Sequence, residues 1–319
     1  MQLSFVIPAM NEADGIEKFY HGMFLPEVER LGMSFEVVFV DDGSQDNTLS
    51  ILQSLAEHDD RVKVVSLSRN FGKEVALTAG MREACGEAVM TIDADGQQPP
   101  SIIPQFIDAW KAGAEIVIGV RGKFEKHGLI AKIGSKIFYK LLRLMGGQST
   151  VEGSTDFRLV DRAALNEYNK MTEHGRIARG LMDWMGFKKA YIDYPYGNRL
   201  AGKPSYSLPR LVGLAVDSLV SMTTTPLVLF GWLGLIITLL SGMLGLFVII
   251  QQFIMHDPLG LNWTGPTCLA IFITFLVGLL FIAQAIVALY ISHIHAETQS
   301  RPLYIINWKQ SRNIKRAAE

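Results

Sequence analysis

Hydrophobic and polar positions follow two different patterns along this chain. In the first 120 residues, short runs rich in Val, Ile and Phe are separated by longer stretches with helical periodicity. These runs predict strands at residues 3–8, 35–41, 62–67, 88–93 and 115–120. The stretches between them predict helices at about 12–31, 46–57, 72–84 and 100–112. Because strands and helices alternate, we expect an α/β fold with a mostly parallel sheet and helices on both faces.

The last third of the chain is far more apolar than the rest. Within residues 218–296 the only charged residue, histidine aside, is Asp257. Two apolar stretches, 227–252 and 267–292, are each longer than the roughly 20 residues that a helix needs to cross a bilayer. We therefore expect a two-helix transmembrane hairpin. The first span carries a stripe of small residues: Gly234, Thr238, Ser241 and Gly245. Such a stripe could let another helix approach closely, which favours homo-oligomers formed through the membrane helices.

The distribution of basic residues predicts the orientation of the chain. The connector between the spans, residues 253–266, contains no Lys or Arg, whereas five basic residues follow the second span. The positive-inside rule then places the tail, and with it the N-terminal domain, in the cytoplasm. The N-terminus has no basic segment of the kind that begins a signal peptide. The predicted parts are a cytoplasmic domain (1–206), a juxtamembrane segment (207–226), the two spans (227–292) and a basic tail (293–319).

A further basic stretch, residues 129–145, has the pattern of an amphipathic helix. Four cations recur at spacings of four, four and three: Lys132, Lys136, Lys140 and Arg143. An apolar stripe lies beside them. Such a helix can lie in the bilayer interface. An ordinary surface helix with a solvated lysine face has the same pattern, but the two spans downstream favour the interface.

Overall composition adds little about partners. The net charge of −1 does not indicate nucleic acid, and no nucleic-acid partner is expected. The two cysteines, Cys85 and Cys268, fall in a predicted soluble helix and a predicted span. A disulfide between them is not expected, which is consistent with a reduced, cytoplasmic domain.

Acidic residues gather where two predicted strands end. Asp41 and Asp42 follow the second strand, and Asp93 and Asp95 follow the fourth. Ligands of parallel sheets bind at the carboxyl ends of strands, and carboxylates there suit a divalent metal and a nucleotide diphosphate. Residues two apart on a strand share a side, so Asp93 and Asp95 are expected to face one ligand, with Gln97 continuing the spacing. Turn formation and helix capping are the simpler alternatives at Asp41 and Asp42.

Three other segments carry candidate chemistry. Pro8, Asn11 and Glu12 follow the first strand at a position that would also suit helix capping. Asp156 lies in Ser-Thr-Asp-Phe-Arg-Leu, where a helix cap is again the alternative. Arg199 and Lys203 could bind a phosphate, unless they form an ordinary basic loop.

Taken in order, these motifs resemble a known family. The segments VIPAMNE (6–12), VDDGS (40–44), SRNFGKE (68–74), DAD (93–95) and DFRL (156–159) resemble the family 2 glycosyltransferases of the GT-A fold. Nearly the whole chain is similar to the polyprenyl-phosphate glycosyltransferases with two C-terminal spans. The resemblance implies a GT-A, Rossmann-like domain in the bacterial inner membrane. It also implies inverting transfer of a sugar, glucose first, from a UDP-sugar to polyprenyl phosphate.

The resemblance also implies roles for individual residues. It puts the nucleotide sugar among Pro8, Asn11, Glu12, Asp41, Asp42, Arg69, Lys73 and Asp93. It gives Mg²⁺ or Mn²⁺ to Asp95 and Gln97, and the acceptor phosphate to Arg158, Arg199 and Lys203. Catalysis would fall to Asp156, with Asp93 and Asp95. Whether Asp156 acts as base, positioning group or charge stabiliser stays open.

The chain departs from the family pattern at three places. Gly96 stands where the family's metal motif usually has Leu, which would loosen that turn. The basic residue of the segment 202–206 is displaced, and two charges usual late in the second span are missing from 288–293.

Other kinds of function fit parts of the same pattern. A processive polysaccharide synthase would carry a Gln-x-x-Arg-Trp motif and more spans, which are not found. A membrane scaffold with an inactive transferase domain remains the alternative, although its acidic motifs would be expected to have decayed.

Overall fold

The computed structural model describes residues 1–122, 153–173, 178–195, 265–299 and 301–314, with a few isolated positions (197, 232, 236–237, 239–240 and 243). The chain forms two compact units. The first consists of Met1–Lys140, Gln148–Arg210 and Arg301–Glu319. The second consists of Leu141–Gly147 and Leu211–Ser300. The last residues of the chain therefore belong to the same unit as the first.

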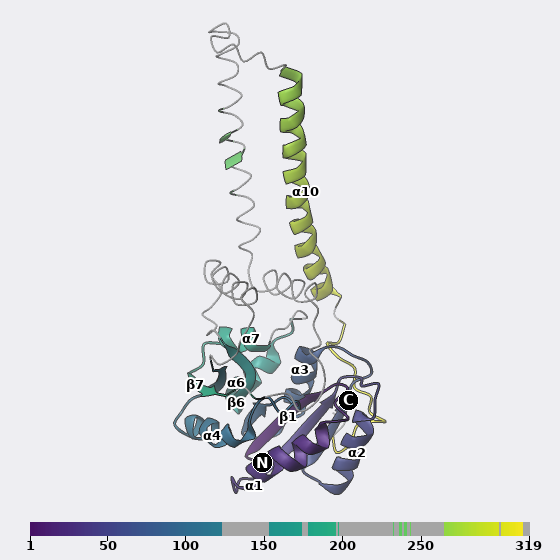
Figure 1. The fold of residues 1–319 in the computed structure, drawn as a ribbon, viewed down its shortest axis with the longest axis vertical. Helices are drawn as coiled ribbons and strands as arrows, with labels where there is room; N and C mark the ends of the chain where they lie inside the picture. Colours follow the sequence, from purple (N-terminus) through teal and green to yellow (C-terminus); the bar gives the residue numbers. More distant parts are fainter. Residues whose placement is uncertain are drawn as a thin grey trace. The chain divides into compact units, whose positions relative to one another are not determined.

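The first unit is built on a seven-stranded sheet (Figure 1). Its strands are β1 (Leu3–Ala9), β2 (Phe35–Asp41), β3 (Val62–Ser66), β4 (Ala88–Thr91), β5 (Ile116–Arg121), β6 (Ser154–Asp161) and β7 (Lys189–Tyr194). They are arranged in the order β3-β2-β1-β4-β6-β5-β7. Strands β1 to β4 are parallel, and β7 is parallel to β5. Only β6 runs antiparallel to both of its neighbours, so the expected mostly parallel sheet is confirmed.

Helices cover both faces of this sheet, as expected. They are the π-helix Lys18–Phe24, α1 (Leu25–Glu29), α2 (Thr48–His58), α3 (Lys73–Glu83), the 3₁₀-helix Pro100–Ile102, α4 (Ile103–Lys111), α6 (Arg162–Lys170) and α7 (Ala178–Trp184). The single helix expected at 12–31 is instead the π-helix followed by α1, which has Pro26 in its first turn. Proline has no N–H to donate, so it suits the first turn of a helix, where that N–H has no partner within the helix.

The core lies in two layers because successive strand residues point to opposite faces. On β1, Phe5 and Ile7 pack with residues of α1, α2 and α4, whereas Val6 packs with residues of α3, α6 and α7. All seven residues of β2 are buried. A continuous apolar run of this kind is typical of a parallel strand covered on both faces.

The structure corrects the geometry expected for the fourth strand. Strand β4 ends at Thr91, so Asp93 and Asp95 lie in the turn that follows it and not on the strand. Strands β6 and β7 were not predicted. Asp156 lies within β6, which excludes the alternative that it caps a helix; Asp161 does so instead, since its carboxylate accepts a hydrogen bond from the Ala163 N–H.

The C-terminal residues 301–314 (yellow in Figure 1), which we call the strap, pack against the edge strand β3. Two antiparallel bridges join them, Val64 to Arg312 and Leu67 to Ile306. The Asn307 N–H donates to the Ser66 carbonyl at 2.7 Å, and the Ser66 N–H donates to Ser311 Oγ at 3.0 Å. The strap therefore covers the hydrogen-bonding edge of the sheet.

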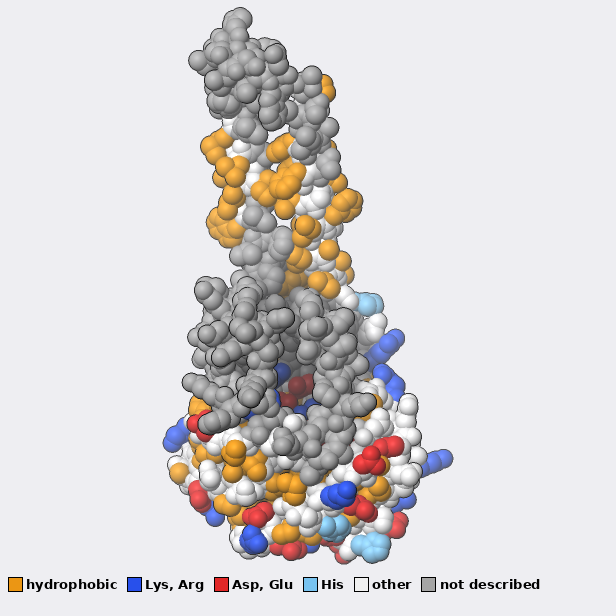
Figure 2. All heavy atoms as spheres, viewed as in Figure 1, with side chains coloured by type: hydrophobic (Ala, Val, Ile, Leu, Met, Phe, Trp, Pro, Cys, Tyr) orange, Lys and Arg blue, Asp and Glu red, His pale blue; other side chains and the backbone are white. Residues whose placement is uncertain are grey.

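In the second unit the structure describes one long helix, α10 (Gly265–Thr298), of 34 residues. At 1.5 Å per residue it is about 51 Å long. Residues Phe275–Ser292 are long and apolar enough to cross a membrane, and they fall within the expected span 267–292. Figure 2 shows apolar side chains exposed along this helix, among them Leu280 and Phe281. The expected helix 129–145 and most of the expected span 227–252 lie outside the described residues, so the hairpin stays a prediction.

Candidate active site

The loops that follow β1 and β2 are joined by hydrogen bonds. The Asn11 N–H donates to Ser44 Oγ at 3.0 Å, and the Gln45 N–H donates to Asn11 Oδ1 at 2.8 Å. The Glu12 N–H donates to Thr48 Oγ1 at 2.8 Å. These contacts fix the predicted donor-site residues of the two strand ends beside one another, since the strands are paired up to Ala9 and Asp41. Pro8 lies one residue earlier in the same register, opposite Val40.

The two adjacent carboxylates at the end of β2 have different surroundings. The Asp41 side chain accepts from the Ser44 N–H at 3.3 Å, and its burial raises the pKa of that carboxyl group. Asp42 accepts from the N–H groups of Phe71 and Gly72 at 2.7 and 2.9 Å. Burial raises the pKa of Asp42 too, although these two donors oppose the rise. Asp42 therefore holds the loop 68–72 against the end of β2.

Gly43 lets this loop approach the end of β2 closely. A Cβ at this position would lie 2.6 Å from the backbone carbonyl carbon of Arg69, and Gly43 has φ +71°. Only glycine adopts this left-handed conformation without steric cost. In the same loop, the guanidinium of Arg69 stacks on the Phe71 ring, with Cζ 4.1 Å from the ring centroid. The loop then runs directly into α3, whose first residue is Lys73.

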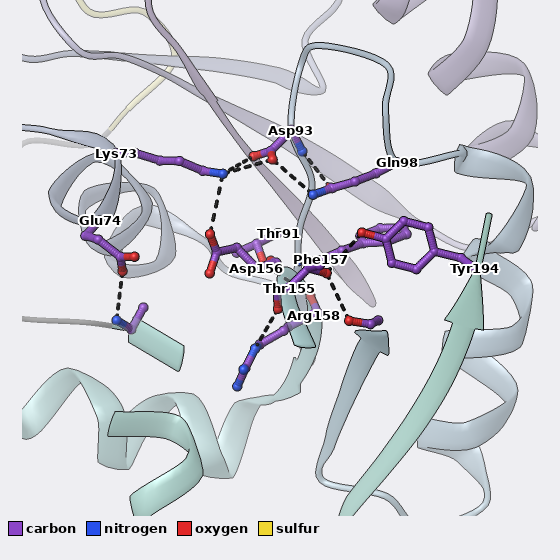
Figure 3. A network of polar contacts seen from close by, with 12 residues as sticks. Lys73, Glu74, Thr91, Asp93, Gln98, Thr155, Asp156, Phe157, Arg158 and Tyr194 are labelled. Carbon is purple, nitrogen blue, oxygen red and sulfur yellow. Dashed lines mark hydrogen bonds and ion pairs between the residues drawn. The ribbon is translucent and has the colours of Figure 1, made fainter. Parts of the chain in front are cut away.

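Lys73 contacts two of the acids that were expected to be catalytic, Asp93 and Asp156 (Figure 3). Its Nζ lies 2.7 Å from Asp93 Oδ1 and 3.5 Å from Asp156 Oδ2. Residues 73, 93 and 156 come from α3, the β4 turn and β6, so the fold brings together three motifs that are far apart in the sequence. The side chains are partly accessible, with 39% of Lys73, 25% of Asp93 and 19% of Asp156 exposed.

The two acids of this cluster differ electrostatically. Burial raises the pKa of Asp93, and Lys73 only partly offsets the rise. Burial also acts on Asp156, but there the nearby cations outweigh it and lower the pKa of the carboxyl group: Lys73, Arg179 and Arg158. Asp156 is therefore an ionised carboxylate at neutral pH.

The residue that orients Asp93 was not predicted from the sequence. Gln98 accepts from the Asp93 N–H at 2.9 Å and donates from Nε2 to Asp93 Oδ2 at 3.0 Å (Figure 3). Gln98 is almost completely buried. It follows the metal motif directly, so its position in the sequence was the only signal available.

Asp95 and Gln97 form a tight turn. Asp95 Oδ1 accepts from the Gln97 N–H at 3.0 Å, and Gln97 Nε2 donates to the Gly197 carbonyl at 3.4 Å. Gly96, between them, has φ +74°, a conformation that suits glycine better than the leucine usual in the family. The described residues hold no group of three acidic, His or Cys side chains that could bind a metal by themselves. One carboxylate beside an amide still fits a hard cation that takes its other ligands from a diphosphate.

Arg158 lies in the interior. Its side chain is 2% exposed, with Nη1 3.2 Å from Asp183 Oδ1 and Nε donating to the Thr155 carbonyl at 3.0 Å. The guanidinium is therefore enclosed by the protein, with Nη1 paired to Asp183. Arg199 and Lys203, the other two expected acceptor residues, lie outside the described residues.

Glu74 is a further acid that the sequence analysis missed. Its Oε2 accepts from the Ala178 N–H at 2.8 Å, which joins α3 to the first turn of α7 (Figure 3). Burial, reinforced by the nearby charge of Asp156, raises the pKa of Glu74 to about 7. Thr91 contributes from β4 by donating its hydroxyl to the Asp156 carbonyl, which ties β6 to β4 at the centre of the site.

Known proteins resemble this chain over nearly its whole length. Residues 4–168 match glycosyl transferase family 2. The prophage bactoprenol glucosyl transferase homolog of Escherichia coli is 34% identical over 96% of this chain and 98% of its own length. The bactoprenol glucosyl transferase of Shigella phage SfV is 34% identical over 97% of this chain and 100% of its own.

Two further proteins are similar to this chain. An uncharacterized glycosyltransferase of Synechocystis is 33% identical over 96% of this chain and 95% of its own length. The solved structure of glucosyl-3-phosphoglycerate synthase from Mycobacterium tuberculosis, in complex with Mn²⁺, UDP and phosphoglyceric acid, is 20% identical. It covers 67% of this chain and 75% of its own, with a TM-score of 0.47. The family match and the near-full-length relatives confirm the resemblance found in the sequence: this chain is a glycosyltransferase and belongs to glycosyl transferase family 2.

Proposed function

We propose that this enzyme transfers glucose from UDP-glucose to a polyprenyl phosphate at the cytoplasmic face of the bacterial inner membrane. The observation that carries the proposal is the cluster of Lys73, Asp93 and Asp156 at the carboxyl edge of the sheet. Several near-full-length relatives have the words bactoprenol glucosyl transferase in their names. The word bactoprenol supports a polyprenyl carrier, and the word glucosyl supports glucose as the sugar.

The nucleotide sugar would bind across the carboxyl ends of β1, β2 and β4, where an α/β sheet binds its ligands. Pro8, Asn11, Glu12 and Asp41 lie around the first two strand ends. Asp42 supports this site indirectly, through the loop that carries Arg69 and leads to Lys73.

Asp95 and Gln97 would hold the divalent cation, Mg²⁺ or Mn²⁺, together with oxygens of the donor diphosphate. When bound, this cation offsets negative charge that grows on the leaving diphosphate. Asp93 would meet the ribose and diphosphate from the same turn, with its carboxylate oriented by Gln98.

Asp156 would act through its charge. An acceptor phosphate has a second pKa of about 6, so it is already largely anionic at neutral pH and needs no strong base. The lowered pKa of Asp156 makes its carboxylate a weak base as well. These two facts favour a role in stabilising positive charge on the sugar, or in orienting the acceptor, while the phosphate oxygen attacks the anomeric carbon from the face opposite the diphosphate. Configuration at that carbon is then inverted.

The strap supports the proposed orientation in the membrane. Residues 301–314 pair with β3, so both ends of the chain must lie on one side of any membrane that it crosses. The number of crossings between them is then even. With α10 as one crossing, the predicted span 227–252 supplies the second.

This orientation can be tested by cysteine labelling from outside the cell. A cysteine placed at 257–263 should react with an impermeant reagent, and a cysteine at 309 should not. Labelling at 309 in intact cells would overturn the orientation.

The reaction can be tested with the purified full-length enzyme. Radiolabelled UDP-glucose is incubated with undecaprenyl phosphate and Mg²⁺ or Mn²⁺, and the lipid product is extracted and identified by mass spectrometry. UDP-galactose, GDP-mannose and UDP-N-acetylglucosamine serve as competing donors. We expect a glucosyl lipid that is lost with chelator and in Asp95→Ala. Release of free glucose without lipid product, or no turnover of any donor, would refute the proposal.

A further inference from the structure

The first turn of α7 is fixed from two sides by charged residues, one partly buried and one buried. Glu74 accepts from the Ala178 N–H at 2.8 Å, and Arg158 Nη1 donates to the Arg179 carbonyl at 3.4 Å. Arg158 also pairs with Asp183, at the far end of the same helix. The backbone of Arg179 is therefore held on both sides, while its side chain remains exposed.

Arg179 lies beside the reaction centre. It lines a small hollow together with Asp156, Thr91 and Arg158. Its positive charge is among those that outweigh burial and lower the pKa of Asp156. Arg158 lines the same hollow, and within the described part of the chain its Nη2 is buried without a hydrogen-bond partner. Asp156 itself lies between Lys73 and Arg158 (Figure 3).

A dianionic phosphate that approaches this centre meets the carboxylate of Asp156. Like charges repel, so the approach needs a cation that is accessible and not already paired. Arg158 is buried on Asp183, and Lys73 contacts both Asp93 and Asp156. Of the three described cations near Asp156, Arg179 is the most exposed, since Lys73 is partly exposed and Arg158 is buried.

We propose that Arg179 binds the phosphate of the polyprenyl acceptor, and that Glu74 positions it through the Ala178 N–H. This inference rests on the proposed function. A guanidinium binds phosphate through two parallel hydrogen bonds, which a lysine cannot reproduce. Arg158, expected from its motif to contact the acceptor, then acts from the interior by fixing the Arg179 backbone.

The test measures acceptor and donor separately in the full-length enzyme. A lost charge-assisted interaction is worth about tenfold to a hundredfold in affinity. Arg179→Gln should therefore raise the KM for undecaprenyl phosphate about tenfold or more, with the Kd for UDP-glucose within about twofold. Arg179→Lys should recover part of the loss. The control is Lys188→Gln, an exposed cation shortly after α7, which should leave both constants unchanged.

The positioning role of Glu74 has its own readout. Glu74→Ala should raise the KM for the acceptor, whereas Glu74→Gln, which keeps an oxygen for the Ala178 N–H, should not. In the double variant Glu74→Ala/Arg179→Gln the two effects should not add, because both act through one contact.

Two results would overturn the inference. One is an unchanged acceptor KM in Arg179→Gln; the other is a rise in the donor Kd that matches the rise in acceptor KM. Failure of the wild-type enzyme to use any polyprenyl phosphate would instead refute the proposed function.

Discussion

Glu74 is an acid whose ionisation opposes folding, and its replacement gives a quantitative test of the site's electrostatics. Burial, followed by the charge of Asp156, raises its pKa from an ordinary 4.5 to about 7. Between these two values the folded protein keeps a proton that the unfolded chain has lost. Stability therefore falls as pH rises from about 4.5 to about 7, and stays at the lower level above that.

The size of the effect follows from the shift. One pKa unit corresponds to about 1.36 kcal/mol, so a difference of roughly 2.5 units costs about 3 kcal/mol once Glu74 is ionised in both states. Glutamine carries no charge and keeps a side-chain oxygen for the Ala178 N–H. Glu74→Gln should therefore stabilise the protein by up to about 3 kcal/mol at pH 8. For a domain of this size that corresponds to a rise in Tm of about 6–12 °C.

Thermal unfolding of the full-length protein in detergent, from pH 4.5 to 8.5, measures this difference. We expect the Tm of Glu74→Gln to exceed that of wild type at pH 8 and the two to converge towards pH 4.5. Glu167→Gln is the matched control, because Glu167 is exposed and pairs only with Lys170 on the surface of α6. A Glu74→Gln variant that is no more stable at pH 8, or that is equally more stable at pH 4.5, would refute the reasoning.

Three further substitutions test other parts of the site. Gly43→Ala puts a methyl group 2.6 Å from the Arg69 backbone at φ +71°. It should therefore lower the free energy of unfolding, measured by urea denaturation, by about 2 kcal/mol, and it should weaken UDP-glucose binding. A denaturation midpoint equal to that of wild type would contradict this. Asn313→Ala removes two hydrogen bonds that its side chain donates to backbone carbonyls at 2.8 and 3.0 Å. Hydrogen exchange in β3 should accelerate, and unchanged protection would show that the strap does not depend on them. Asp156→Asn should lower turnover about a hundredfold while calorimetry finds the donor Kd unchanged, and undiminished turnover would remove Asp156 from the reaction centre.

The sequence predicted those strands that are buried on both faces. Strand β2, Phe-Glu-Val-Val-Phe-Val-Asp, is apolar enough to be found from composition alone. Strand β6 was missed because Asp156 and Arg158 interrupt its apolar residues. Arg158 is buried only because Asp183, on a helix 25 positions later, neutralises it. A local pattern that treats arginine as a surface residue cannot detect such a partner.

The candidate site was predictable where a residue's type carried the signal. Asp93 and Asp156 were identified from motifs, and the fold connects them through Lys73. The reason given for pairing Asp93 with Asp95 was wrong, however, because a turn and not strand alternation places these two residues together. Glu74 was not singled out, since its importance arises from contacts with α7 that are made only in the folded chain.

The strap has a structural role that its basic residues alone do not predict. The sequence indicates only that the residues after the second span are basic and point to the cytoplasm, whereas the structure pairs residues of the strap with the edge strand β3. An uncovered edge strand invites pairing with other chains, so the strap protects the sheet. It also has a consequence for the site. The Ser68 N–H donates to the Ile305 carbonyl at 2.8 Å, and Ser68 begins the loop that Asp42 holds and that leads into Lys73. Only seven positions separate Ile305 from the end of α10 at Thr298. The covalent chain therefore joins the apolar helix to the strap, and a hydrogen bond joins the strap to the loop that leads into Lys73.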